Sequence, residues 1–298
     1  MLVAMTGASG FIGSALAASF VNDGHRVRSV GRGAANDVRW DPAAQLLAPE
    51  ALDGVDAVVH LAGEPIGERW TTERKQAIRE SRIHGTRLIA GSIARLAARG
   101  SGPRVLVSAS AIGYYGDRRD EWLDESSAPG SDFLAEVVQV WEAAAEPARL
   151  AGVRVVTLRA GIALNPRGGA LAKMLPPFRL GAGGRLGNGE QWMSWIGLRD
   201  LVRAFRFAVD TSGLEGAANA VAPVPVTNAE FTTVLAHVLT RPAFATIPAF
   251  ALRALFGELA DATLLASQRV RPAKLVASGF TFGDPTLDGA LRAELARA

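Results

Sequence analysis

Three glycines near the amino terminus have a spacing that suits the binding of a phosphate group. Gly7, Gly10 and Gly13 follow a short apolar run, residues 2–5, and precede an Ala- and Leu-rich run with helical composition, residues 14–20. Glycine at such a corner allows a tight turn, the approach of a pyrophosphate and close packing of helix on strand. The N–H groups that begin the helix then face the phosphates. An ordinary strand-turn-helix corner is the alternative, but the flanking pattern favours dinucleotide binding.

The next predicted strand, residues 26–30, ends without an acidic residue. In dinucleotide-binding folds an Asp or Glu at this place accepts hydrogen bonds from the adenosine ribose of NAD. Here Gly31 and Arg32 follow the strand instead. Because the Arg32 guanidinium can hold a 2′-phosphate, the sequence favours NADP as the cofactor over NAD. The alternative interpretation of Arg32 is a solvated loop arginine.

Composition excludes several other kinds of site. The 298 residues include no cysteine, which removes disulfides, thiol catalysis and thiolate metal ligands, and the four histidines lack metal-ligand spacing. We therefore expect no metal. The net charge is only +3, with no basic block, so we expect no nucleic acid partner. No apolar run is long enough to span a bilayer, and because the glycine corner lies so near the first residue we expect no signal or transit peptide. We expect a cytoplasmic protein, not bound to membranes, that takes a small-molecule substrate; a homodimer is left open.

Alternating strands and helices must hold these groups in place. Besides residues 2–5 and 26–30, apolar runs at residues 55–61, 103–110 and 153–158 are typical of strands buried on both faces of a parallel sheet. Helical patterns lie between them. The predicted fold class is α/β, a Rossmann-type doubly wound parallel sheet with a smaller, mostly helical carboxyl-terminal substrate domain.

The chain divides into two predicted domains. Residues 1–165 form the NADP-binding Rossmann domain, which residues 195–225 complete, and residues 166–194 and 226–298 form a smaller domain that covers the substrate. The carboxyl-terminal part has three further predicted elements, namely helices at residues 231–239 and 250–266 and a strand at residues 276–282.

Small and charged residues follow the strand at residues 55–61. Ala62 and Gly63 let a nucleotide lie across the strand ends, because ligands of open α/β sheets bind at carboxyl ends. The Glu64 carboxylate beside them could reach the substrate. His60, inside the strand, is expected to be a packed core histidine rather than a catalyst.

A charged residue lies on the apolar stripe of the long helix predicted at residues 70–100. The three- and four-residue spacing places Arg82 on the face that should meet the sheet. There the guanidinium needs an anionic partner, such as a cofactor phosphate, or a route to solvent at the helix edge. Both interpretations stay open on the residues alone.

Residues 165–195 have no clear periodicity and are rich in Gly, Pro and Arg. A long irregular segment in a compact domain is usually functional, so we interpret it as a wall of the substrate pocket rather than a structural excursion. Its candidate substrate-binding residues are Lys173, Arg185, Gln191 and Trp192.

The motifs of this chain resemble one family along nearly its whole length. Thr6 to Gly13 is similar to the Gly-x-x-Gly-x-x-Gly fingerprint of the extended short-chain dehydrogenase/reductase superfamily. Further segments resemble its atypical members called epimerase family proteins, which have a carboxyl-terminal domain of unassigned role. These segments are residues 63–66, 110–117, 132–137, 173–178, 191–196 and 227–231. Some members carry a label as cell-division inhibitors, which no exposed amphipathic or charged stretch here supports.

The resemblance implies roles for three side chains that follow the strand at residues 103–110. In the superfamily a serine at this place polarises a substrate oxygen, and Ser110 is the best match. Tyr114 and Tyr115 are then the candidate proton donors. The usual Tyr-x-x-x-Lys pair aligns with Phe133 and Val137, and none of the three lysines follows a tyrosine by four residues.

The family also implies an NADP-binding Rossmann fold. Carried over by position or by place at a strand end, the expected cofactor contacts are Gly7, Ser9, Gly10, Phe11, Ile12, Gly13, Arg32, Leu61, Ala62, Gly63, Arg82, Ser108, Arg159 and Gly161. The expected activity is that of an NADP-dependent oxidoreductase or epimerase acting on a small carbonyl or sugar-like substrate. Because the usual proton-transfer pair is absent, a catalytically degenerate NADP-binding sensor or regulatory module is the alternative.

Overall fold

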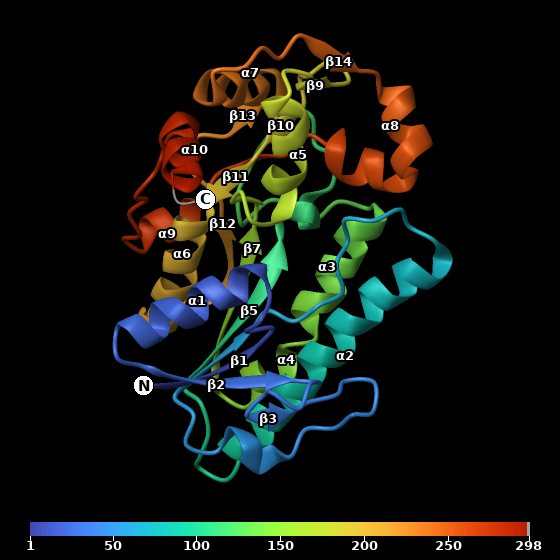
Figure 1. The fold of residues 1–298 in the computed structure, drawn as a ribbon. Helices are drawn as coiled ribbons and strands as arrows, with labels where there is room; N and C mark the ends of the chain where they lie inside the picture. The colour runs from blue at the N-terminus through green and yellow to red at the C-terminus, as the bar shows by residue number, and fades with distance from the viewer. Residues whose placement is uncertain (297–298) are drawn as a thin grey trace.

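The computed structural model describes residues 1–296 and is built on a sheet of seven parallel strands (Figure 1). In spatial order the strands are β12 (Gly216–Ala220), β7 (Arg154–Ala160), β5 (Val105–Ala111), β4 (Ala57–His60), β1 (Leu2–Thr6), β2 (Arg26–Gly31) and β3 (Val38–Arg39). From β1 the chain adds β2 and β3 on one side of the sheet, and then β4, β5, β7 and β12 on the other side. In a doubly wound sheet the crevice for a ligand lies at the carboxyl edge where this order reverses, which here is between β1 and β4. The predicted fold class is confirmed.

Successive strand residues point to opposite faces of the sheet, and each face has its own apolar cluster. Val3 and Met5 of β1 lie in one cluster, whereas Ala4 between them lies in the other. The same alternation separates Val107 from Leu106 in β5. Because both faces are buried, the strands read in sequence as continuous apolar runs.

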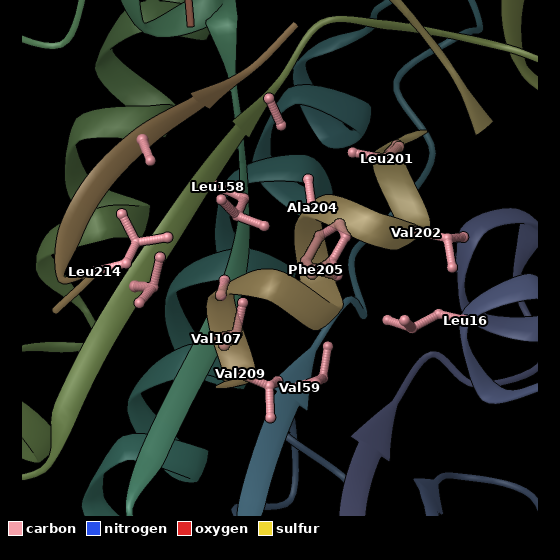
Figure 2. Packing of buried hydrophobic residues seen from close by; sticks show 14 of the residues in the cluster. Leu16, Val59, Val107, Leu158, Leu201, Val202, Ala204, Phe205, Val209 and Leu214 are labelled. Atoms are coloured by element: carbon pink, nitrogen blue, oxygen red, sulfur yellow. The ribbon is translucent and has the colours of Figure 1, made fainter. Parts of the chain in front are cut away.

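Helices cover both faces of the sheet. The first face carries α1 (Phe11–Asn22) and α6 (Leu198–Asp210), whose Leu16 and Phe205 pack against Val59 and Val107 (Figure 2). The second face carries α2 (Thr72–Ala97) and α4 (Glu146–Leu150), and α3 (Phe133–Ala143) packs beside α2. Short elements between them are η1 (Pro49–Leu52), η2 (Ile112–Tyr115) and β6 (Trp122–Leu123).

The carboxyl-terminal lobe lies beyond the carboxyl ends of the strands (Figure 1). Its helices are α5 (Gly169–Arg179), α7 (Asn228–Leu239), α8 (Ala249–Phe256), the π-helix η3 (Ala260–Leu264), α9 (Ala273–Ala277) and α10 (Leu287–Leu295). Its strands are β8 (Ile162–Leu164), β9 (Gly184–Leu186), β10 (Trp192–Met193), β11 (Trp195–Gly197), β13 (Val226–Thr227), β14 (Ala245–Ile247) and β15 (Arg269–Val270). Leu275 and Phe280 pack into the first-face cluster of the sheet, so this part of the lobe is anchored on the Rossmann core.

Three sequence predictions of secondary structure differ from the structure. The segment at residues 165–195 contains helix α5, which the prolines at positions 176 and 177 obscured although both lie inside it. The helix predicted at residues 250–266 breaks at Gly257, whose φ is +62°. The strand predicted at residues 276–282 was wrong: α9 runs to Ala277, and Gly279 then turns the chain with φ +91°.

Candidate functional site

The glycine corner is tight enough that only glycine fits two of its positions. Gly7 has φ +68°, a left-handed conformation that disfavours side chains. A Cβ on Gly13 would stand 2.0 Å from the carbonyl oxygen of Gly7, so helix α1 packs directly on the turn. Gly10 precedes the helix and offers no side chain to cap it. The first N–H groups of α1, from Phe11 and Ile12, therefore have no side-chain acceptor and suit an anion.

One threonine joins the ends of β1 and β4, the two strands that flank the crevice. The Thr6 hydroxyl accepts hydrogen bonds from the N–H of Leu61 at 3.1 Å and of Ala62 at 3.2 Å. It also hydrogen-bonds Nδ1 of His60 at 2.7 Å. Thr6 thereby fixes the backbone that was predicted to lie along the cofactor, a role that its place in the fingerprint alone did not indicate.

His60 is fully buried, as expected of a core histidine, and burial lowers the pKa of His60 to about 4. The unfolded chain binds this proton near pH 6.5, so it binds more protons than the folded chain between pH 6.5 and 4. Stability is therefore lost as the pH falls through this window, by roughly 3 kcal/mol from this group.

We expect His60→Gln to remove that dependence. The difference in unfolding free energy between wild type and this variant should shrink as the pH falls from 7 to 4, measured by urea unfolding. A difference that stays constant between pH 7 and pH 4 would contradict the buried, neutral imidazole of His60.

Arg32 extends from the end of β2 without a protein partner. The side chain is exposed and forms no hydrogen bond or ion pair with any residue in the described range 1–296. The nearby carboxylate of Asp37 is already used, since it accepts from the N–H and the hydroxyl of Ser29 at 2.7 and 2.8 Å. A guanidinium with no acceptor of its own is thus available beside the glycine corner. Ser9 of that corner is also exposed.

Arg82 lies against the strand-end segment, as its place on the helical stripe predicted. Its guanidinium would be 3.4 Å from a Cβ on Gly63, and NH1 donates to the carbonyl oxygens of Glu64 and Ile78, both at 3.0 Å. Burial lowers the pKa of Arg82 to about 10, an effect that the charge of Glu64 opposes. Arg82 remains a cation at neutral pH, and its other nitrogens are free to meet a ligand. The Glu64 carboxylate itself pairs with Arg74 at 3.6 Å.

A buried ion pair occupies the carboxyl ends of β5 and β7. Arg159 meets Glu142 of α3 through two hydrogen bonds of 2.8 Å, and Ser110 donates to the same carboxylate at 2.6 Å. Burial alone would lower the pKa of Arg159, but the hydrogen bonds and charge of Glu142 raise it above its ordinary value. Glu142 was missed in the sequence. An arginine at the end of an apolar strand requires a buried acceptor, which was the available signal.

The two tyrosines of η2 have different environments. Tyr115 is fully buried, donates to Oδ1 of Asn219 at 2.8 Å and accepts from Arg159 at 3.1 Å. Burial raises the pKa of Tyr115 to about 12, against the influence of Arg159 and Asn219. Tyr114 is half-buried, and its ring stacks on the Arg159 guanidinium at 3.4 Å. The Tyr114 hydroxyl has no hydrogen-bond partner among residues 1–296.

Phe133 and Val137 show what has replaced the usual proton-transfer pair. Val137 lies on the buried face of α3 and is 1% exposed. The Phe133 ring meets Trp70 at 5.1 Å and lies under the ammonium of Lys75, 4.4 Å away. An ammonium is therefore present beside this position, but it comes from α2.

The remaining predicted residues lie in two places. Lys173 reaches across to the carbonyl oxygen of Gly67 at 2.8 Å, which places it beside the segment that contains Glu64. Gln191 is buried and donates to Leu186 and Leu264, so its amide supports the lobe. The other predicted side chains of the lobe also have protein contacts: Arg185 donates to Thr246 on neighbouring β14, and Trp192 stacks on Arg269 at 4.0 Å.

Two further predicted contacts lie at the strand ends. Ser108 is buried and its hydroxyl donates to the carbonyl oxygen of Ala109. A Cβ on Gly161 would stand 2.5 Å from the carbonyl oxygen of Ser194, so glycine is needed there for backbone packing. Among residues 1–296 the structure has no group of three or more acidic or histidine side chains placed to hold a metal ion. Within the same range, every helix is too short or too polar to cross a membrane.

Comparison with known proteins identifies the family. The sequence model of the NAD dependent epimerase/dehydratase family matches residues 3–220. The chain belongs to this family. A second model, a domain of unknown function called DUF1731, matches residues 247–294, which begin at the end of β14 and extend into α10. The resemblance noted in the sequence is thereby confirmed.

Relatives within the family match the chain over its whole length. An epimerase family protein of Mycobacterium bovis is 44% identical over 294 residues, which cover 97% of this chain and 96% of that protein. A crystal structure of human epimerase family protein SDR39U1 (isoform 2) with NADPH has a TM-score of 0.90 at 33% identity and full coverage of both chains. A nucleoside-diphosphate sugar epimerase from Corynebacterium glutamicum has a TM-score of 0.81 at 38% identity, with 100% of this chain matched to 58% of that one.

Proposed function

We propose that the protein binds NADP(H) across the carboxyl ends of β1, β2 and β4. In this proposal it acts as an NADP-dependent oxidoreductase or epimerase on a small carbonyl or sugar-like substrate. The glycine corner would hold the pyrophosphate, and Ala62 and Arg82 would line the adjoining wall. The human relative solved with NADPH supports the choice of cofactor. The single observation that carries the proposal is Arg32, an unpaired guanidinium where NAD-binding folds place an acid.

Arg32→Ala is expected to weaken NADPH binding by about 10- to 100-fold, because a charge-assisted hydrogen bond to a phosphate is worth ~1.5–3 kcal/mol. NADH lacks the 2′-phosphate, so its affinity should change little. Isothermal titration calorimetry with both nucleotides measures the two affinities. Arg26→Ala, at the exposed start of the same strand, is the matched control and should leave both unchanged. An equal loss for NADPH and NADH would assign Arg32 a role other than phosphate recognition.

The substrate would lie beside Ser110 and Tyr114. The Ser110 hydroxyl already donates a hydrogen bond to Glu142, so its oxygen is left to accept a hydrogen bond from a substrate hydroxyl. Tyr114 has the uncommitted hydroxyl and is the better candidate for moving a proton, whereas the hydroxyl of Tyr115 is held by Asn219. The cofactor would supply hydride transfer when bound. Stacking on Arg159 fixes the orientation of the Tyr114 ring, and so of the hydroxyl that would move the proton.

The tyrosine pair offers a direct test of these roles. Tyr115→Phe leaves Asn219 without its donor and should lower the free energy of unfolding by ~1–3 kcal/mol. Tyr114→Phe should change stability by less than about 0.5 kcal/mol, yet reduce turnover by about 10²-fold or more. Urea unfolding gives the stabilities, and NADPH absorbance with a panel of carbonyl compounds and nucleoside-diphosphate sugars gives turnover. Normal turnover in Tyr114→Phe would remove Tyr114 from the mechanism.

The substrate class rests on the relative from Corynebacterium glutamicum, which is described as a nucleoside-diphosphate sugar epimerase. A nucleoside-diphosphate sugar carries hydroxyl groups for Ser110 and anionic phosphates for a cation. Lys173, which spans from α5 to Gly67, is the candidate contact for the anionic part.

A catalytically silent NADP sensor is the second candidate, because Phe133 and Val137 replace the pair that normally moves the proton. Stoichiometric retention of NADP(H), with no hydride exchange on the same panel, would favour it. One confirmed turnover with a member of the panel would end it.

A further inference from the structure

Polar contacts join the carboxyl-terminal lobe to the start of α2 and to the segment before it. Lys75 of α2 donates to both carboxylate oxygens of Glu258, at 2.8 and 2.9 Å, just beyond α8. Arg69, before α2, donates to the carbonyl oxygen of Ala254 in the last turn of α8 at 3.2 Å. Both contacts join segments more than 180 residues apart in the chain. They hold α8 across from the amino-terminal end of α2 (Figure 1).

Helix α8 itself is weakly held by the rest of the lobe. Of its eight residues only Leu252 is buried, and Phe250 and Leu255 remain 74% and 65% exposed. A segment with few buried apolar contacts opens at low cost in free energy. Polar contacts to α2 therefore have a large share in fixing where α8 lies.

The exposed segment that contains α8 ends at Glu258, because the next two residues, Leu259 and Ala260, are 5% and 0% exposed. Gly257 ends the helix with φ +62°, and a Cβ there would have no atom nearer than 3.6 Å. The π-helix η3 follows at Ala260–Leu264, a local departure from α-helical geometry that is frequent at functional sites. Arg253 pairs with Asp261 at 2.9 Å and so ties α8 to η3. Because η3 is held by buried Ala260 and by Gln191, which donates to Leu264, the part that can move is α8 with Gly257 and Glu258.

The contact with α2 lies about two helical turns before Arg82. Lys75 and Arg82 are seven residues apart and share one face of α2. Arg82 packs at Gly63 on the expected cofactor wall, and the Lys75 ammonium is 4.4 Å from the ring of Phe133. A segment that closes on Lys75 would thus close beside the reacting end of the cofactor.

We infer that α8, together with Gly257 and Glu258, forms a lid over the Phe133 end of the nucleotide cleft, and that the Lys75–Glu258 ion pair is its latch. The latch opens to admit and release ligand and closes to shield the site from water. Both side chains are partly exposed, at 31% and 51%, so the pair is weak enough to open readily. This inference rests on the proposed function, because the lid covers the proposed NADP(H) site.

A double-mutant cycle tests the latch. Glu258→Gln and Lys75→Met, which keeps an apolar stem on Phe133, should each speed NADPH release about threefold to fivefold at low salt. The double variant should release NADPH no faster than either single variant, because one interaction is lost in all three. Stopped-flow fluorescence measures the release. Arg292→Gln, which breaks a similarly exposed pair with Asp288 on α10, is the control and should match wild type.

Hydrogen exchange of the α8 amides in the nucleotide-free protein gives a readout that does not need NADPH. The three latch variants should exchange faster than wild type over residues 249–256 by a similar factor. Exchange and release equal to wild type, or effects that multiply in the double variant, would overturn the latch. If wild type fails to bind NADPH, the proposed function falls, whereas the exchange data still decide whether the pair holds α8.

Discussion

Gly13→Val is expected to abolish NADPH binding and to lower the free energy of unfolding by about 3 kcal/mol. The added Cβ would lie 2.0 Å from the Gly7 oxygen and 2.8 Å from the Gly7 carbonyl carbon, both of them backbone atoms. Either α1 or the turn must move, and overpacking of this kind typically costs ~1–3 kcal/mol, occasionally more. Moving the helix also moves the N–H groups that would meet the pyrophosphate.

Calorimetry with NADPH and urea unfolding measure the two effects. Gly91→Ala on α2 is the matched control, because a Cβ at Gly91 would have no neighbour within 4 Å. Alanine in a helix interior should stabilise this variant by ~0.5–1 kcal/mol and leave NADPH binding intact. If Gly13→Val bound NADPH as wild type does, the glycine corner would not be the pyrophosphate site.

Arg159→Leu is expected to destabilise the fold by about 3–5 kcal/mol, because it leaves the Glu142 carboxylate buried without its counter-ion. Ser110 alone would then hydrogen-bond that carboxylate, and Tyr115 would lose a donor. Removing both charges is milder, since buried ion pairs can be replaced by apolar residues at little cost. The double variant Arg159→Leu/Glu142→Leu should therefore be more stable than Arg159→Leu.

Urea unfolding of wild type, both single variants and the double variant measures this order. As a control, Arg104→Leu removes one side of an exposed pair with Asp56 and should cost no more than about 1 kcal/mol. A double variant less stable than Arg159→Leu would contradict the explanation that the single variant is destabilised by the unpaired buried charge of Glu142.

The Rossmann half of the fold could be predicted because local and long-range signals agree there. Strands buried on both faces appear as apolar runs, and Gly7 and Gly13 are needed for reasons visible in the backbone itself. The position of Arg82 followed from helical periodicity. The secondary structure of the carboxyl-terminal lobe was harder to predict, because Pro176 and Pro177 lie inside α5 and a break at Gly257 splits one apolar stretch into two helices.

The polar network of the site could be predicted only in part. Ser110 and Arg159 lie at strand ends, where ligands bind, but their shared partner Glu142 comes from a helix 17 residues before Arg159. The sequence also did not predict which of the adjacent residues Tyr114 and Tyr115 is buried. The hydroxyl of Tyr115 is the one that finds a partner in the interior, Asn219, and that contact depends on the tertiary fold. Such pairings depend on tertiary contacts that no local pattern records.

The central claim is that the glycine corner and Arg32 together form a site for NADP(H). Calorimetric titration of the purified wild-type protein with NADPH and, separately, with NADH tests it most directly. We predict one NADPH per chain, bound at least about tenfold more tightly than NADH, as expected from one charge-assisted contact to the 2′-phosphate. No heat of binding with NADPH, or a preference for NADH, would contradict the account.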